Sequence, residues 1–330
     1  MSLTGASKRG RKFINQIPTE SVGFGKMLPI LKEYINNKAE NIPKQALGPF
    51  ETDISIYNSP PESGLRITWI GHSSLLIEID GKRILTDPVW GERVSFSSFI
   101  GPKRFFLAPL SIRELPPLDA IIISHDHYDH LDKDTIKCFK DTTIPFFCSL
   151  GVGAYLQRWG IEANYIHELD WGDSVMIGND TVVTAAPARH FSGRGITGRD
   201  ETLWSSFVIK GSRHNIYFGA DSGWSPAFEE IGNQFGPFDL TILEIGAYGK
   251  YWADIHMGPD HASDAHLALK GKVMMPVHWG TFNLAPHAWH EPIERLTACA
   301  KEKHIELFAP KPGEPTEVKP FVSNWWKPYL

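Results

Sequence analysis

The sequence is poor in cysteine and contains no long apolar run. Its 330 residues include only three cysteines, Cys138, Cys148 and Cys299, which form no paired spacing. Isolated cysteines indicate neither a disulfide framework nor a thiolate zinc site, and they favour a reducing compartment. No apolar run approaches the roughly 20 residues that cross a bilayer, and none follows the basic residues at 8–12 as it would in a signal peptide. The sequence therefore predicts a cytoplasmic protein.

A basic excess is also missing. The formal net charge is -5, whereas proteins that bind nucleic acid usually carry a surplus of Lys and Arg. We therefore expect no nucleic-acid partner. The hydrophobic content of 42% is ordinary for a globular protein, and the chain is long enough to bury a sizeable core.

Chemically reactive side chains gather directly after a short apolar run at residues 120–124, which is typical of a strand buried on both faces. The run is followed by His125, His127, Asp129 and His130. Neighbouring side chains leave the backbone in divergent directions, so these four groups suit two metal ions better than one. The first two can turn toward one ion and the last two toward a second. Imidazole nitrogen and carboxylate oxygen are ligands for zinc, iron or manganese.

Three further candidates, His190, Asp221 and His278, each follow an expected strand. Folds of the α/β class place their chemistry at the carboxyl ends of strands. We therefore expect these side chains to converge with the histidine motif, as a site for two ions requires.

The motif His125-x-His127-x-Asp129-His130 resembles the signature of the metallo-β-lactamase superfamily. Its flanks resemble one branch, the N-acylphosphatidylethanolamine-hydrolysing phospholipase D and its bacterial relatives. The flanking motifs include Gly71-His72-Ser73-Ser74, Leu85-Thr86-Asp87-Pro88 and His278-Trp279-Gly280-Thr281-Phe282. The resemblance covers about residues 66–303 and implies a four-layer αββα sandwich, an α/β fold in which two mixed sheets are flanked by helices.

The resemblance also implies how the ligands are shared between the ions. The first ion would be held by His125, His127 and His190, the second by Asp129, His130 and His278, and both by Asp221. An Asp at position 221, in place of the Cys typical of lactamases, favours hydrolases with an oxygen bridge. The expected cofactor is two Zn²⁺, with Mn²⁺ or Fe as alternatives.

Other residues near the motif are expected to support this site. In relatives, the carboxylate corresponding to Asp87 holds a metal-binding imidazole by its other nitrogen; the alternative is that Asp87 caps a turn. His72 is expected to be a hydrogen-bonded histidine under the site. His256 precedes a helix that is opened by Gly258-Pro259. It matches a position that points toward the site in relatives, which implies a catalytic residue; the alternative is a surface residue. Asp129 and Asp221 are the other expected catalytic residues.

We place the hydrolase domain at residues 65–330 and expect residues 1–64 to form an arm, a helix and a connector. Residues 1–20 show little periodicity, which indicates a loosely ordered arm. Residues 22–37 carry a helical stripe formed by Phe24, Met27, Leu28, Leu31, Tyr34 and Ile35. This helix either packs on the domain or touches the inner face of a membrane.

Two other segments carry aromatic side chains. Residues 95–107 place four Phe around Lys103 and Arg104, which suits a substrate with apolar and anionic parts or, alternatively, anchors a long loop to the core. Residues 311–330, which contain Trp325 and Trp326, are expected to wrap the body or to meet a second subunit in a homodimer.

Simple local patterns predict several elements. Asp80-Gly81 predicts a type I′ hairpin, and residues 161–167 are expected to form a strand. Asp132 or Asp134 is expected to cap a short helix that ends near Phe139.

The resemblance implies a metal-dependent hydrolase, foremost a phosphodiesterase that cleaves N-acylphosphatidylethanolamine-like phospholipids in the manner of a phospholipase D, through a hydroxide that bridges the ions. A phosphodiester also suits two cations, since both can share its charge. The alternatives are a lactone, ester or amide hydrolase with the same metals, a redox di-iron protein and a purely structural metal protein that is no enzyme. Di-iron relatives need a flavin-bearing partner domain, and no further domain is expected here.

Overall fold

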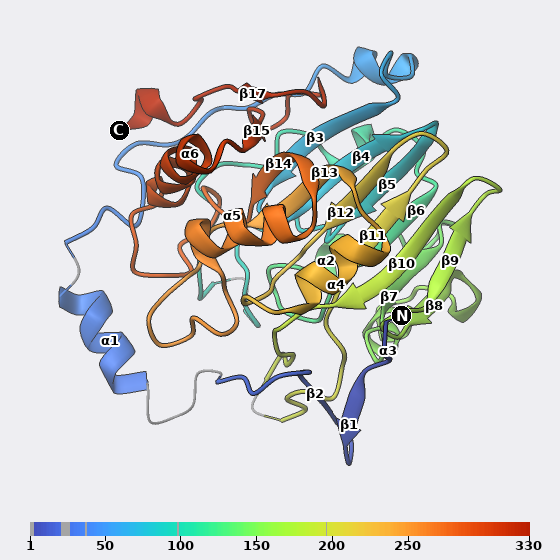
Figure 1. Ribbon diagram of the computed structural model, residues 1–330, viewed down its shortest axis with the longest axis horizontal. Coiled ribbons are helices and arrows are strands. Elements are labelled where there is room, and N and C mark those ends of the chain that lie inside the picture. Colours follow the sequence, from blue (N-terminus) through green and yellow to red (C-terminus); the bar gives the residue numbers. More distant parts are fainter. Residues whose placement is uncertain (1–2, 21–26, 37, 98, 196) are drawn as a thin grey trace.

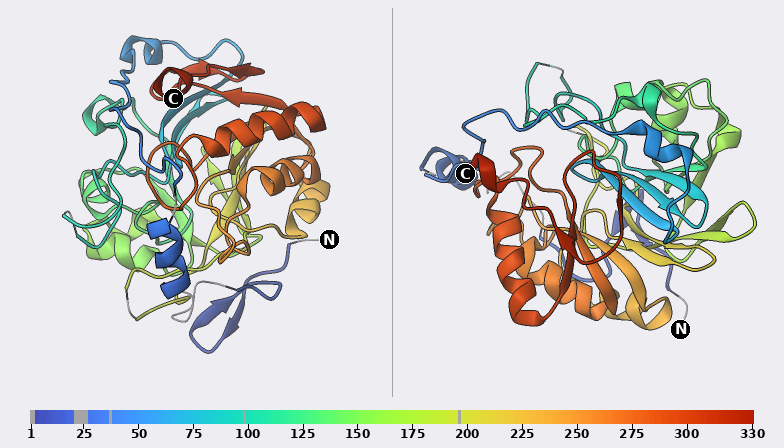
Figure 2. Two further views of the ribbon diagram at one scale, coloured as in Figure 1. Left: turned by 90° about the vertical axis from the view of Figure 1, so that its left-hand side faces the viewer. Right: turned by 90° about the horizontal axis from the view of Figure 1, so that it is seen from above.

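Two large sheets lie face to face, and helices cover their outer faces (Figure 1). The structure is a computed structural model that describes residues 3–20, 27–36, 38–97, 99–195 and 197–330. Turning the molecule shows the same layers from the side and from above (Figure 2). The predicted αββα sandwich is confirmed.

The first sheet holds the strand that precedes the histidine motif. Its strands, in spatial order, are β16 (Thr316–Glu317), β3 (Leu65–Gly71), β4 (Ser74–Ile79), β5 (Lys82–Thr86), β6 (Ala120–Ile123), β7 (Phe146–Ser149) and β8 (Ile166–Leu169). Strands β16 to β5 pair in antiparallel fashion, and β5 to β8 pair in parallel. The predicted hairpin between β4 and β5 is present, and Asp80 and Gly81 adopt its positive φ angles of 48° and 85°.

The second sheet carries the other candidate ligands. Its strands, in spatial order, are β17 (Phe321–Val322), β15 (Glu306–Ala309), β14 (Gly271–Val277), β13 (Phe238–Glu244), β12 (Asn215–Phe218), β11 (Ser205–Lys210), β10 (Thr181–Pro187) and β9 (Ser174–Ile177). Strands β9 to β12 are antiparallel, whereas β12 to β17 are parallel.

The helices are mostly short. They are α1 (Met27–Asn36), α2 (Lys133–Lys137), α3 (Gly153–Arg158), α4 (Ala227–Gln234), α5 (Gly258–Ala268) and α6 (Glu291–Lys303), with 3₁₀ turns η2 (Ile54–Asn58), η3 (Ile112–Glu114), η4 (Ala163–Tyr165) and η5 (Lys327–Tyr329). Asp132 caps α2 by accepting from the Asp134 amide, as predicted. Among the helices described, none is long and apolar enough to span a bilayer.

The strand predicted at residues 161–167 is wrong over most of its length. The Tyr165 amide donates to the Glu162 carbonyl and closes the turn η4, so β8 begins only at Ile166. An apolar residue at every second or third position suits a helical turn as well as a strand, and the packing of the chain after α3 decides between them.

The main core lies between the two sheets. Strand β4 illustrates its construction, because Leu75, Ile77 and Ile79 enter this core while Leu76 packs in the cluster on the outer side with residues of α2 and α3. Both faces of the strand are thus buried, which explains the unbroken apolar run from Leu75 to Ile77.

The arm predicted to be loosely ordered contains a small hairpin, formed by β1 (Ser7–Arg9) and β2 (Lys12–Ile14). Phe13 is buried between exposed neighbours and packs with Trp171 and Trp204, which is why this short segment is held on the body. The prediction was wrong because the apolar partners of Phe13 lie far away in the sequence.

Helix α1 occupies part of the predicted range 22–37, and Phe24 of the proposed stripe lies outside the described residues. The helix lies at the margin of the molecule in Figure 1. Ile30 packs against the cluster that contains Trp252 and Ile255, whereas Leu28 is 70% exposed. At the other end of the chain, Trp325 and Trp326 are buried against Trp279, so the C-terminal segment wraps the body.

Candidate metal centre

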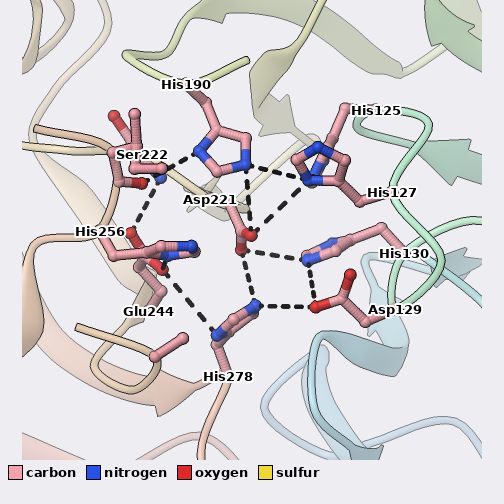
Figure 3. Close-up of polar contacts among 12 residues, drawn as sticks. His125, His127, Asp129, His130, His190, Asp221, Ser222, Glu244, His256 and His278 are labelled. Carbon is pink, nitrogen blue, oxygen red and sulfur yellow. Dashed lines mark hydrogen bonds and ion pairs between the residues drawn. The ribbon is translucent and has the colours of Figure 1, made fainter. Parts of the chain in front are cut away.

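The candidate ligands converge at the ends of strands from both sheets (Figure 3). The loop after β6 contributes four side chains, and the segments after β10, β12 and β14 contribute one each. These residues are His125, His127, Asp129 and His130, followed by His190, Asp221 and His278. All seven predicted ligands are therefore brought together, although their roles as ligands stay predictions.

The first group of ligand atoms faces one oxygen of Asp221. His125 Nε2 lies 2.8 Å from His127 Nδ1, which lies 3.2 Å from His190 Nε2. Asp221 Oδ2 is 3.9 Å from His125 Nε2 and 3.7 Å from His190 Nε2. These atoms lie within 4.8 Å of one another, close enough to surround one ion.

The second group faces the other oxygen of the same carboxylate. Asp221 Oδ1 lies 3.1 Å from both His130 Nε2 and His278 Nε2. Asp129 Oδ2 is 3.4 Å from His278 Nε2 and 3.8 Å from His130 Nε2. Each oxygen of Asp221 thus faces a different cluster, as its predicted role as a bridge between two ions requires.

The second group passes a test for metal binding. Among the described residues, His130 Nε2, His278 Nε2 and Asp221 Oδ1 are buried and have no hydrogen-bond partner. Buried polar atoms are otherwise almost always paired. These three atoms carry lone pairs and face one another without forming hydrogen bonds. A cation between them would satisfy all three, so the residues present fit a metal ion.

Hydrogen bonds on the far side of the rings fix their orientation. His130 Nδ1 lies 2.7 Å from Asp87 Oδ2, the contact predicted for Asp87. His125 Nδ1 is 2.9 Å from Ser124 Oγ, and His190 Nδ1 is 3.0 Å from the Ile255 carbonyl. A ring that donates at Nδ1 keeps the lone pair of Nε2 for a metal ion.

His72 lies beneath this centre. Its Nε2 lies 3.0 Å from Asp129 Oδ2, so the predicted hydrogen-bonded histidine is confirmed. Burial lowers the pKa of His72 to about 3, against the opposing effect of Asp129, so the ring is neutral. A neutral ring that donates to Asp129 orients this carboxylate without neutralising its charge.

The backbone around the centre adopts unusual conformations. His72, Asp87, Ala220 and His278 have φ angles of 55°, 36°, 48° and 62°. Non-glycine residues are uncommon in this region, and each costs on the order of 1–3 kcal/mol. Such residues cluster where the surrounding structure holds a site in place.

Close backbone contacts add to this constraint. A Cβ added to Gly223, two residues after Asp221, would lie 1.8 Å from the Asp254 carbonyl oxygen. Only glycine permits that approach.

Comparison with known proteins agrees with the site. Residues 82–279 match the family model described as the beta-lactamase superfamily domain. A Caenorhabditis elegans protein named N-acyl-phosphatidylethanolamine-hydrolyzing phospholipase D 1 is 38% identical over 71% of this chain and 69% of its own length. The chain belongs to the metallo-β-lactamase superfamily. Within it, the chain falls in the branch that resembles this phospholipase D, and it is a metal-dependent hydrolase.

Other similar proteins extend the comparison. A Mycobacterium tuberculosis protein described as uncharacterized is 48% identical over 80% of this chain and 72% of its own length. Solved structures include an isothiocyanate hydrolase from Delia radicum gut bacteria, with a TM-score of 0.62, 20% identity and coverage of 78% of this chain and 100% of that chain. A metallo hydrolase from Ignicoccus hospitalis has a TM-score of 0.60 at 20% identity, and the match covers 77% of this chain and 98% of that chain. The structural likenesses show the shared metallo-β-lactamase fold.

Sequence reasoning missed Glu244 in this metallo-β-lactamase site. Glu244 ends β13, is fully buried, and its Oε2 lies 2.6 Å from His256 Nδ1. Its other oxygen accepts from the Ser222 amide at 3.0 Å. A carboxylate at the end of an apolar strand is the same signal that singled out Asp221, so the sequence contained the clue.

His256 itself lies at the centre. Its ring centroid is 5.1 Å from that of His190 and 5.3 Å from that of His278. Burial lowers the pKa of His256, but the Glu244 carboxylate outweighs this effect and raises it above its ordinary value. Of the two interpretations made from the sequence, the structure favours a residue of the site, and its catalytic role stays a prediction.

The electrostatics of the centre favour cations. Burial lowers the pKa of His125 and of His190 well below the ordinary value, so both are neutral imidazoles, the form that binds metal. Burial acts in the same direction on His278, but the carboxylates of Asp221 and Asp129 outweigh it and raise the pKa of His278 to about 10. These carboxylates attract positive charge, which divalent ions would supply in place of protons.

A second contact missed from the sequence holds the metal loop. Arg194 Nη1 donates to the carbonyls of Asp126 and Leu131 at 2.7 and 2.6 Å. The Gly193 amide donates to Asp126 Oδ1 at 2.7 Å. Both ends of the loop that carries the histidine motif are thus tied to residues 193–194.

The interpretation of Lys103 and Arg104 as cations that meet an anionic substrate is wrong for Arg104. Its guanidinium is buried and donates to the carbonyls of Val89, Ile70 and Phe106. Arg104 therefore anchors the loop, the alternative considered above. Lys103 is exposed and pairs with Glu92 at 2.6 Å.

Two acidic residues of α5 pair with the neighbouring helix α6 and not with the centre. Asp260 pairs with Arg295 and Asp264 with Lys303, both on α6. At the centre, Asp129 and His256 are 15% and 13% exposed, while His130, Asp221 and His278 are almost fully buried. His127 is also partly exposed, so solvent reaches the site from the side of His127, Asp129 and His256.

Proposed function

We propose that the protein is a phosphodiesterase with two Zn²⁺ ions that hydrolyses N-acylphosphatidylethanolamine-like phospholipids and releases phosphatidate. The observation that carries the proposal is the position of Asp221 between two ligand groups, which supports two ions at one substrate. The phospholipase D name of the Caenorhabditis elegans relative supports the lipid substrate.

The chain supplies the ligands and a proton. When bound, two divalent ions lower the pKa of water and stabilise negative charge on phosphoryl oxygens. Asp129 and Asp221 neutralise only part of their charge, so the centre attracts an anionic diester. His256, held at Nδ1 by Glu244, presents its other nitrogen and is placed to donate a proton to the leaving ethanolamine oxygen. No side-chain nucleophile is required.

We further propose that a membrane surface presents the substrate. Phe96, Phe99 and Ile100 form the tip of the loop between β5 and β6, and Phe99 is 87% exposed. The base of this loop lies beside the centre, because Val94 packs with Phe282 and Tyr128. An exposed aromatic tip near the site suits the interface of a bilayer.

The test is a hydrolysis assay with the purified, zinc-loaded protein. N-acylphosphatidylethanolamine in mixed micelles is expected to yield phosphatidate and an N-acylethanolamine, both measured by mass spectrometry, and a generic aryl phosphodiester is expected to turn over more slowly. Lactone, ester, amide, β-lactam and thioester substrates serve as the comparison set. Turnover of these with no diester cleavage, under zinc, manganese and iron, would assign the protein to the alternative class.

A further inference from the structure

A segment near the start of the chain lies against the loop that carries His190. It comprises residues 13–20, which are the end of β2 and the dark blue trace that follows this strand in Figure 1. The cavity at this contact has a volume of about 480 Å³ and is lined by residues from both the segment and the loop.

Asn15 makes the central contact. Its Nδ2 donates to the His190 carbonyl at 2.7 Å, and its Oδ1 accepts from the His190 amide at 3.1 Å. The Trp204 indole also donates to Asn15 Oδ1, at 3.1 Å. Because the His190 amide and the Trp204 indole both donate to the same atom of Asn15, that atom must be the carboxamide oxygen. The orientation of the carboxamide is therefore fixed.

The following residues join this loop to the segment before His256. Arg189 donates to the Pro18 carbonyl at 2.7 Å and pairs with Asp254 at 2.9 Å. The Glu20 amide donates to Asp254 as well, at 2.8 Å. Residues 13–20 therefore hold both segments that approach the centre from this side.

We propose that Asn15 is a positioning residue for His190 in the metal centre. The proposal rests on the assignment of His190 as a metal ligand. One carboxamide satisfies both backbone groups of His190, while the Ile255 carbonyl orients its ring at Nδ1. Together these contacts determine where Nε2 lies, and ligand atoms must be held to within about 0.5 Å of their productive positions.

The test measures the affinity of each metal ion separately. Metal-free protein is titrated with Zn²⁺ against a competing chelator, and Co²⁺ absorption reports the coordination of each site. Asn15→Ala and the isosteric Asn15→Asp, which places an oxygen against the His190 carbonyl, are compared with Gln16→Ala, an exposed carboxamide next in the chain. We expect both Asn15 variants to lower the affinity for one ion about 10-fold and to leave the affinity for the other ion unchanged.

His190→Ala identifies the affected ion. It is expected to lower the affinity for the same ion. The double variant Asn15→Ala/His190→Ala is then expected to bind both ions with the same affinities as His190→Ala alone. Equal weakening of both ions, or a lower melting temperature of the metal-free protein without a selective loss, would show a purely structural role and overturn the proposal, as would failure of both Asn15 variants to fold. The titration uses no substrate, so its result is independent of the diester assay.

Discussion

Asp221 contacts both ligand groups through separate oxygens, and the loss of its side chain is expected to affect both ions. We predict that Asp221→Ala retains neither ion after dialysis and has no hydrolase activity, measured by elemental analysis and diester turnover. Asp260→Ala, which removes a surface carboxylate paired with Arg295, is the matched control and should keep both ions. An Asp221→Ala protein with one fully occupied site would show that Asp221 does not bridge.

Buried Glu244 holds the partly exposed His256, and the effect of removing His256 should depend on the leaving group of the substrate. If His256 donates the proton, His256→Ala should lower turnover of the phospholipid by roughly 10²- to 10⁴-fold with both ions bound. An aryl diester, whose leaving group needs no proton, should lose much less. The exposed His261 on α5 provides the control His261→Ala. Equal losses for both substrates would instead indicate a role in binding.

At the scale of elements, Asp80 connects the two sheets. It lies in the turn between β4 and β5, and it accepts from the Arg213 and His214 amides between β11 and β12 at 2.7 and 2.9 Å. We predict that Asp80→Asn, which keeps the size and the tolerance for positive φ, lowers the free energy of unfolding by about 1–3 kcal/mol. Thermal unfolding of metal-free protein measures this, with the exposed Asp180→Asn as the control.

The same carboxylate predicts a pH dependence. Burial raises the pKa of Asp80, but the hydrogen bonds from Arg213 and His214 outweigh it and hold this pKa below its ordinary value. Because the pKa of Asp80 is lower in the folded state than the value of about 3.9 in the unfolded chain, the ionised carboxylate stabilises the fold at pH values above about 3.9. This stabilisation is lost as the pH falls through the pKa of the folded state. The difference between wild type and Asp80→Asn should thus be largest near neutral pH and shrink toward pH 3. A difference that grew on acidification would contradict this assignment.

At the scale of the whole molecule, the exposed loop tip and α1 are separate candidates for membrane contact. We predict that the double variant Phe96→Ser/Phe99→Ser loses binding to anionic phospholipid vesicles in co-sedimentation, and that salt weakens only the electrostatic part of wild-type binding. Leu267→Ser, at a half-exposed position on α5, is the control. Undiminished binding of the double variant would exclude the loop.

Helix α1 needs its own variant. The stripe predicted from the sequence would be tested by deleting residues 1–40, but that deletion also removes Phe13 and Asn15, which contact the body and the His190 loop. Leu28→Glu changes an exposed residue of α1 without disturbing those contacts. We predict that it weakens vesicle binding if α1 lies on the membrane; unchanged binding would leave α1 as a helix that packs on the body through Ile30.

The sequence alone determined the fold class and which residues converge at the centre. The histidine motif follows a buried strand, and His190, Asp221 and His278 each follow a strand of their own, so the rule that chemistry lies at strand ends brought them together in advance. The resemblance implied that Asp87 holds a metal-binding imidazole, and the structure shows this contact with His130, since the two residues lie at the ends of the neighbouring strands β5 and β6.

Only the tertiary structure decided which partners support those residues. Asn15 and His190 are 175 residues apart, and the buried position of Phe13 depends on Trp171 and Trp204 from a distant part of the chain. Arg104 looked like a free cation because its charge is visible in the sequence, whereas the backbone carbonyls that accept from it are not. Local patterns record what each residue can do, but such contacts form only when folding brings distant segments together, so no local pattern specifies them.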